Sequence, residues 1–220
     1  MNTLLRGLIT SIALLGIVFC CSGCVSVKPK DYTAYRQHFP KSILVLPPIN
    51  NSTNVDGTYS YYTTVTVPLA EQGYYVFPAV LTEQMFKENG LPSPVDMHAA
   101  PLDKLREVFG ADAVLYITLK QYGTKYVVIS SNTTVSADAR LVDIDTSTEI
   151  WSGSITLTQG SGDGGGGIVG ALVSAVITQV VNTKSDAAYN VSIMANDQLF
   201  RTNQGLLLGH RHPKHGETVK

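Results

Sequence analysis

The sequence contains no cysteine beyond residue 24. All three cysteines, Cys20, Cys21 and Cys24, lie close to the N-terminus of a chain of 220 residues. Disulfide scaffolds, cysteine-ligated zinc sites and cysteine nucleophiles are therefore excluded from the rest of the sequence.

Charge is scarce as well. Only 15% of the residues are charged, and 16 basic residues against 17 acidic ones leave a formal net charge of −1. Nucleic-acid binding requires a clustered surplus of lysine and arginine, so this balance gives no support for it. The 44% of hydrophobic residues is typical of one globular domain with a packed core.

Apolar runs long enough to cross a bilayer are also missing. A bilayer-spanning helix takes roughly 20 residues, and the two apolar runs in the sequence are both shorter. The second run, residues 168–181, is interpreted as a core helix or as a surface for self-association or partner docking. The first, residues 7–20, follows Arg6 and precedes a small-residue site. This order predicts a secretory signal peptide over residues 1–23.

Ser22 and Gly23 before Cys24 resemble the bacterial lipobox, in which the cysteine is acylated and becomes the mature N-terminus. Cys21 stands where that pattern prefers leucine. The resemblance implies lipidation of Cys24 and a strong membrane anchor. Val25 replaces the aspartate that the sorting pattern associates with inner-membrane retention, which points to the outer membrane. The alternatives are a signal peptide cut elsewhere and an uncut N-terminal anchor.

The remaining chain is divided into a tether over residues 24–40, a single α/β domain over 41–200 and a polar tail over 201–220. We predict the helices and strands of the domain from the spacing of apolar residues and from the proline and glycine residues that lie at element ends. Helices are expected over 58–72, 79–89, 101–109 and 186–200, with a proline-rich loop over 91–100. Strands are expected over 42–46, 74–77, 113–119, 133–144 and 149–158. The fold class is therefore α/β, a mixed sheet flanked by helices, with an antiparallel meander in its C-terminal half.

Two loops are candidate ligand sites. The first, residues 50–56, contains Asn50, Asn51 and Asp56 and follows a buried strand, where α/β folds place ligands; the alternative is a turn rich in asparagine and serine. The second is the glycine tract 160–167, which contains a G-x-G-x-x-G pattern. Because the tract has low complexity and follows an alternating strand, a connector is favoured over a phosphate site.

No motif indicates an enzyme, a cofactor or a metal. The sequence has no G-x-S-x-G elbow, and no paired carboxylates are placed on recognisable rigid elements. His210, His212 and His215 lie in the predicted tail and are interpreted as solvated rather than metal-ligating.

Four long stretches resemble one family of bacterial lipoproteins, the uncharacterised family that includes a meningococcal genome-derived lipoprotein antigen. They are SILVLPPINNSTNVDGTYSYYTTVTVPLAEQGYYVFP, KLREVFGADAVLYITLKQYGTKY, SSNTTVSADARLVDIDTSTEIWSGS and GGGIVGALVSAVITQVVN. The helix–GADAVLYI–meander order is more distantly similar to the N-terminal domain of TolB and to the curli-secretion lipoprotein. The resemblance implies a TolB-N-terminal-like domain, an outer-membrane lipoprotein, dimerisation and a partnership with curli-secretion-like lipoproteins. It carries no catalytic residues.

Together these observations favour a non-enzymatic outer-membrane lipoprotein, a structural or adaptor component of an envelope transport, secretion or assembly complex. The alternative hypothesis is a periplasmic small-ligand or nucleotide-binding protein that uses loop 50–56 or the glycine tract 160–167.

Overall fold

The computed structural model describes residues 29–127, 130–160 and 187–216. The chain divides into two units, Met1–Lys30 and Asp31–Lys220, and the fold below is that of the second. Cys24, the apolar run 168–181 and the glycine tract beyond Gly160 lie outside the described residues.

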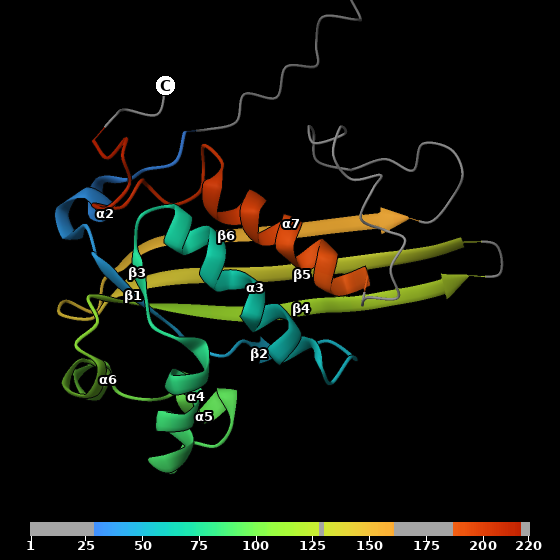
Figure 1. The fold of residues 1–220 in the computed structure, drawn as a ribbon, viewed down its shortest axis with the longest axis horizontal. Coiled ribbons are helices and arrows are strands. Elements are labelled where there is room, and N and C mark those ends of the chain that lie inside the picture. Colours follow the sequence, from blue (N-terminus) through green and yellow to red (C-terminus); the bar gives the residue numbers. More distant parts are fainter. Residues whose placement is uncertain (1–28, 128–129, 161–186, 217–220) are drawn as a thin grey trace, which may run out of the picture. The chain divides into compact units, whose positions relative to one another are not determined.

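One mixed sheet of six strands forms the centre of the unit (Figure 1). The strand order is β3-β1-β4-β5-β6, and β2 also pairs with β4. β1 is parallel to both neighbours, whereas β4, β5 and β6 form an antiparallel meander. The prediction of a mixed α/β sheet with a C-terminal meander is thereby confirmed. The strand bounds are β1 Ser42–Val45, β2 Ile49–Asn50, β3 Tyr75–Val76, β4 Ala113–Val127, β5 Ser130–Asp143 and β6 Glu149–Gly160.

Helices cover both faces of the sheet, but unequally. α3 (Gly57–Glu71) and α7 (Ala187–Arg201) lie over one face (Figure 1). α4 (Ala79–Glu88), α5 (Pro94–His98) and α6 (Leu102–Phe109) pack on the other face beside β1. Ile43 and Val45 accordingly belong to one core cluster and Leu44 and Leu46 to the other. A strand buried on both faces requires the continuous apolar run from which β1 was predicted.

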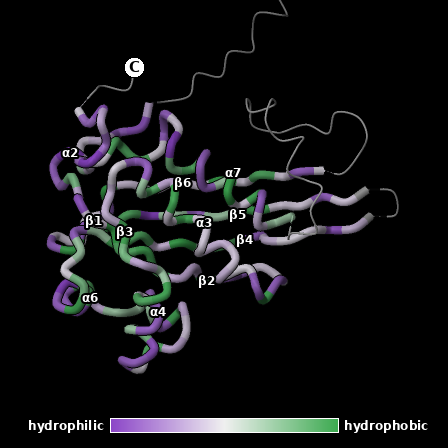
Figure 2. The backbone as a smooth tube through the Cα atoms, viewed as in Figure 1, coloured by the Kyte–Doolittle hydropathy of each residue, from purple (hydrophilic) through white to green (hydrophobic). Residues whose placement is uncertain are grey.

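The meander is apolar where α3 and α7 cover it and, on the opposite face, where Val114, Tyr116 and Val142 join the smaller core. Ala137, Ala139 and Leu141 of β5 are buried in the larger core. On the opposite face, Thr118, Asp138 and Ser154 stand side by side across β4, β5 and β6. Hydrophilic residues are accordingly frequent toward the far ends of these strands (Figure 2).

β4 is much longer than predicted. The apolar run that predicted residues 113–119 ends at Leu119, but the strand continues to Val127. Pairing with β5 sustains it, with a register shift between Leu119 and Gln121. In the second half of β4, backbone hydrogen bonds to β5 stabilise the extended conformation, although the residues there no longer form an apolar run.

The predicted tether is too long, because the fold begins at Asp31 rather than at residue 41. Residues 33–38 form the helix α2 (Thr33–His38), and the Tyr35 side chain is fully buried. The Tyr35 hydroxyl lies 2.5 Å from the hydroxyl of Tyr74. These aromatic contacts supply the burial that the polar composition of residues 24–40 did not indicate.

The predicted tail is also partly folded. Leu206 is buried in the larger core, and the Tyr32 hydroxyl donates to the carbonyl oxygen of Gly205 at 2.6 Å. The His215 ring packs edge-on against Phe39, with 5.0 Å between ring centroids. The described part of the tail, residues 202–216, therefore packs beside α2.

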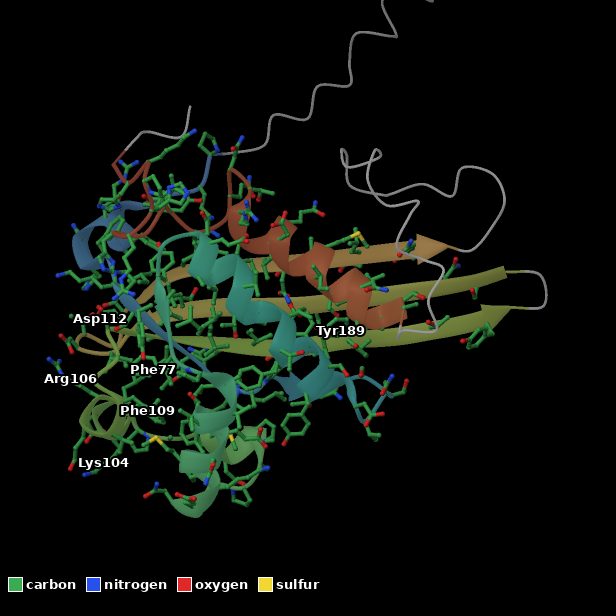
Figure 3. The ribbon with its side chains drawn as sticks, in the orientation of Figure 1. Phe77, Lys104, Arg106, Phe109, Asp112 and Tyr189 are labelled. Atoms are coloured by element: carbon green, nitrogen blue, oxygen red, sulfur yellow. The ribbon has the colours of Figure 1, made fainter. Side chains whose placement is uncertain are left out.

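A short helix interrupts the predicted loop 91–100. α5 begins after Ser93, whose hydroxyl accepts a hydrogen bond from the Asp96 amide at 3.2 Å. Pro94 occupies the first turn, where its missing N–H is harmless. Met97 is then fully buried in the smaller core. Phe77 and Phe109 (Figure 3) close that core, with 6.0 Å between their ring centroids.

Within the described ranges, no helix is both long enough and apolar enough to cross a membrane.

Candidate functional site

Loop 50–56 uses its polar groups internally. The Asn50 side-chain oxygen accepts from the amide and the hydroxyl of Ser52, at 2.9 and 2.7 Å. The Asn50 side-chain amide donates to the carbonyl oxygen of Asn54 at 2.7 Å. The Asn51 amide donates to the Leu119 carbonyl at 2.8 Å, which fastens the loop to β4. This is the geometry of the asparagine- and serine-rich turn that stood as the alternative to a ligand site.

Asp56 is exposed and directly precedes α3. Its side chain makes no capping hydrogen bond. Its backbone amide donates a hydrogen bond to the side-chain oxygen of Asn54 at 3.0 Å, which ties the residue to the loop. Asn50, Asn51 and Asp56 therefore belong to one turn, and their functional groups are not gathered around a shared cavity.

His212 and His215 of the C-terminal segment make local contacts, whereas the buried Nδ1 atom of His210 has no hydrogen-bond partner among the described residues. A ring nitrogen of His215 lies 2.8 Å from the Leu208 carbonyl oxygen, and the Lys214 amide donates to His212 at 3.1 Å. Over the residues that the structure describes, no cluster of three or more histidine, cysteine, aspartate or glutamate side chains has metal-binding geometry.

A polar depression of about 350 Å³ lies on the meander, on the face away from α3 and α7. Asp138, which lines it, forms an ion pair with Lys120, with 2.7 Å between nitrogen and oxygen. The Ser154 hydroxyl also donates to Asp138 at 2.7 Å. The Lys120 and Ser154 hydrogen bonds lower the pKa of Asp138, which favours its ionised form. The depression is lined by Thr118, Asp138, Ala139, Arg140, Glu149, Ser152, Gly153 and Ser154.

An aromatic stack supports the same face. The Arg140 guanidinium lies 4.1 Å from the centre of the Tyr116 ring, and His98 meets Tyr116 edge-on at 5.3 Å. A ring nitrogen of His98 lies 3.0 Å from the carbonyl oxygen of Pro47. Burial lowers the pKa of His98 to about 4, so the ring is neutral at physiological pH and acts as a packing element.

The outer edge of β6 is the strongest candidate for an interaction site. β5 pairs with one edge of β6 along its length, and no strand in the described ranges pairs with the other. Near its start, β6 is covered by α2 and by the C-terminal segment, where the Trp151 indole donates to the Gln204 carbonyl at 3.1 Å. We call residues 153–160 the open edge.

The open edge lacks the usual protection of an edge strand. Its sequence, GSITLTQG, contains no charged residue and no proline. Natural edge strands commonly carry lysine, proline or a bulge that prevents pairing with another chain. The alternating pattern of residues 149–158 predicted the strand but not this site, because only the strand order reveals which strand lies at the edge.

Comparison with known proteins identifies close relatives. The family model described as "Putative lipoprotein GNA1162-like" matches residues 30–211. The "Putative lipoprotein NMB1124/NMB1162" of Neisseria meningitidis serogroup B is 46% identical over 201 residues, which cover 90% of this chain and 94% of that protein.

A solved structure agrees with this relationship. The crystal structure of lipoprotein GNA1162 from Neisseria meningitidis is 50% identical, covers 66% of this chain and all of that chain, and superposes with a TM-score of 0.55. The PelC dodecamer from Paraburkholderia phytofirmans is 15% identical, covers 75% of this chain and 88% of that chain, and has a TM-score of 0.48. That second likeness is too weak to carry a functional argument.

Proposed function

The chain belongs to the GNA1162-like family of lipoproteins, and from that premise we propose that it is a non-enzymatic lipoprotein of the outer membrane, anchored through Cys24. It serves as a structural or adaptor component of an envelope transport, secretion or assembly complex. Curli-secretion-like lipoproteins, to which the sequence bears a more distant likeness, are candidate partners in that complex.

The observation that carries this proposal is the open edge. A strand added to an exposed sheet edge gains main-chain hydrogen bonds along its whole length, and a protein can bind in this way without a pocket. The first occupant that we propose is a second copy of the chain, with two β6 strands antiparallel about a twofold axis. Exposed Ser154, Thr156 and Thr158 are uncharged, so identical strands meet without like-charge repulsion.

The titratable groups on the same face support a binding role rather than catalysis. Asp138 is ion-paired with Lys120, and burial lowers the pKa of His98 to about 4, so its ring is neutral although it lies against the Pro47 carbonyl. The hydrogen bonds from Lys120 and Ser154 lower the pKa of Asp138, which makes this carboxylate a weaker base toward the Ser154 hydroxyl that donates to it.

The test uses the chain starting at Val25, which keeps every described contact because these all involve residues after 28. We expect wild-type protein to be a dimer by light scattering coupled to size-exclusion chromatography. Thr158→Lys places like charges across the twofold axis and yields a monomer. Thr134→Lys is the matched control: Thr134 lies one strand inward, and its hydroxyl shares a 3.1 Å hydrogen bond with Thr158, so both variants lose the same bond.

The proposal is wrong if wild-type protein stays monomeric at the highest soluble concentration, or if both variants dissociate equally. Amide hydrogen exchange adds a second criterion. Strong protection, in a monomer, of those amides of residues 153–160 that do not bond to β5 means that the edge is already filled within the chain. A photo-cross-linker at Thr156 in intact cells then identifies envelope partners, with Gln84 on the exposed side of α4 as the control position.

A further inference from the structure

Positive charge collects at one end of the unit without compensation. Arg36, Lys41, Arg211 and Lys214 are exposed, and in the part of the chain that the structure describes none of them forms an ion pair. Most other described cations pair with carboxylates, as Lys104 does with Glu107 at 2.7 Å. We call these four residues the basic end.

The four residues are held together by a chain of contacts. The Arg211 guanidinium lies 5.6 Å from the centre of the Tyr75 ring, and the Tyr75 amide donates to the Lys41 carbonyl at 3.0 Å. Lys214 adjoins His215, whose ring packs on Phe39 at the end of α2, the helix that carries Arg36. Segments from near the two ends of the folded unit therefore form one surface.

The carboxylates nearby are bound to other groups. Asp112 (labelled in Figure 3) accepts hydrogen bonds from the amides of Lys41 and Ser42 at 2.8 and 2.9 Å. Asp143 lies 3.5 Å from the His38 ring and also accepts from the Thr146 amide. Because these acids are engaged elsewhere, the four cations are left to an external anion.

The chain's connectivity indicates which anion. Residues 25–30 are all that separates Cys24 from the start of the folded unit at Asp31, and a fully extended chain over that interval spans at most about 25 Å. An acylated Cys24 therefore holds the α2 end of the unit within about 25 Å of the lipid surface. The Debye length near physiological salt is about 8 Å, so cations attract anionic lipids only when they come within about that distance of the surface. A tether of at most about 25 Å allows the α2 end of the unit to reach the surface that closely.

We infer that the basic end is a docking surface for the phosphate headgroups of an anionic membrane. This inference rests on the proposed anchoring at Cys24, and the two signals act together: acyl chains supply insertion and the four cations supply orientation. In the docked state β5 runs away from the lipid surface, with Asp143 near the basic end, beside His38, and Ser130 at the far end. Its 14 residues span roughly 45 Å, so the open edge projects away from the lipid.

The test measures partitioning of the unacylated chain starting at Val25 onto vesicles. Its failure is distinguishable from failure of the anchor, because no acyl group is present. We expect binding to phosphatidylcholine vesicles containing about 30% phosphatidylglycerol at low salt, and little binding to pure phosphatidylcholine. Each surface cation contributes a factor of about five, so Arg36→Gln with Lys214→Gln lowers the partition coefficient about 30-fold.

The matched control, Lys87→Gln with Lys125→Gln, removes the same net charge from exposed positions and is expected to bind like wild type. Lys87 lies 5.8 Å from the centre of the Tyr59 ring near the start of α3, and Lys125 lies near the end of β4, so both are away from the basic end. A second pair, Lys41→Gln with Arg211→Gln, repeats the loss independently of the first, and circular dichroism verifies that each variant folds. Equal binding to both vesicle types, or an equal loss in the control pair, overturns the inference.

Discussion

Replacing Asn196 by alanine tests how α3 and α7 are joined above the sheet. Asn196 of α7 is fully buried, and its side-chain oxygen accepts a hydrogen bond from the Tyr61 hydroxyl of α3 at 2.6 Å. Its side-chain amide donates to the Thr64 hydroxyl at 2.8 Å. Because Tyr61 is also fully buried, the alanine variant leaves the phenol hydroxyl without a partner and without water.

The expected loss of stability is about 3 kcal/mol. A buried polar group left unsatisfied costs about 1–3 kcal/mol, and the small cavity left by the shorter side chain adds about 1 kcal/mol. For a domain of this size, 1 kcal/mol corresponds to a change in melting temperature of about 2–4 °C, so we expect a fall of about 9 °C.

Urea unfolding of the chain starting at Val25, followed by circular dichroism and by fluorescence of the single tryptophan, Trp151, measures this loss. Gln198→Ala, on the same helix but only half-buried, is the control and should change stability by less than about 0.5 kcal/mol. A double-mutant cycle with Tyr61→Phe isolates the pair. If the two single losses simply add in the double variant, the hydrogen bond does not couple the helices and the reasoning is refuted.

Three further predictions concern other parts of the chain. His98 has a pKa of about 4 against an ordinary value of 6.5, so the unfolded state binds the proton more readily between these values. The contribution of neutral His98 to the free energy of unfolding is therefore fully present above pH 6.5 and falls by about 2 kcal/mol, allowing for partial exposure, as the pH drops to about 4. His98→Asn is expected to flatten this pH profile. An NMR titration of the ring gives the pKa directly. Gly73→Ala costs about 3 kcal/mol in urea unfolding, because Gly73 has φ +90° and a Cβ there would lie 2.4 Å from the His212 amide nitrogen. Gly90→Ala, at φ +81° with nothing within 4 Å, should cost only about 1 kcal/mol, and equal losses would contradict the role of the contact. Cys24→Ser abolishes incorporation of an alkyne-labelled fatty acid in cells, whereas Cys21→Ser does not; labelling that survives the Cys24 change places the acyl group elsewhere.

Sequence patterns correctly predicted the elements whose conformation depends on neighbouring residues. Gly110, with φ +64°, ends α6 as its sequence position indicated, and Gly90 likewise follows α4. The alternation in β5 and β6 correctly separated the buried face of the meander from its polar face. These features depend on backbone conformation and on period, which neighbouring residues determine.

Features that depend on distant partners were missed. α2 is stabilised by the contact of Tyr35 with Tyr74, and the second half of β4 by pairing with β5, so neither is apparent from its own residues. The open edge and the basic end depend on strand order and on the meeting of both chain ends. Loop 50–56 was ambiguous because asparagine suits both a ligand site and a turn, and only the hydrogen bonds of Asn50 distinguish them. Lipidation of Cys24, which lies outside the described residues, remains a prediction.

The contact between the two ends of the folded unit also bears on when the protein folds. The Tyr32 hydroxyl donates to the carbonyl oxygens of Asn203 and Gly205, across sequence separations of 171 and 173 residues, and Tyr74 donates to Leu207. α2 therefore cannot reach its final packing until almost the whole polypeptide has been synthesised. Contacts this distant form late and slowly. We expect the nascent chain to stay loosely structured during translation, which keeps it threadable through a translocation pore, and to complete its fold only after export.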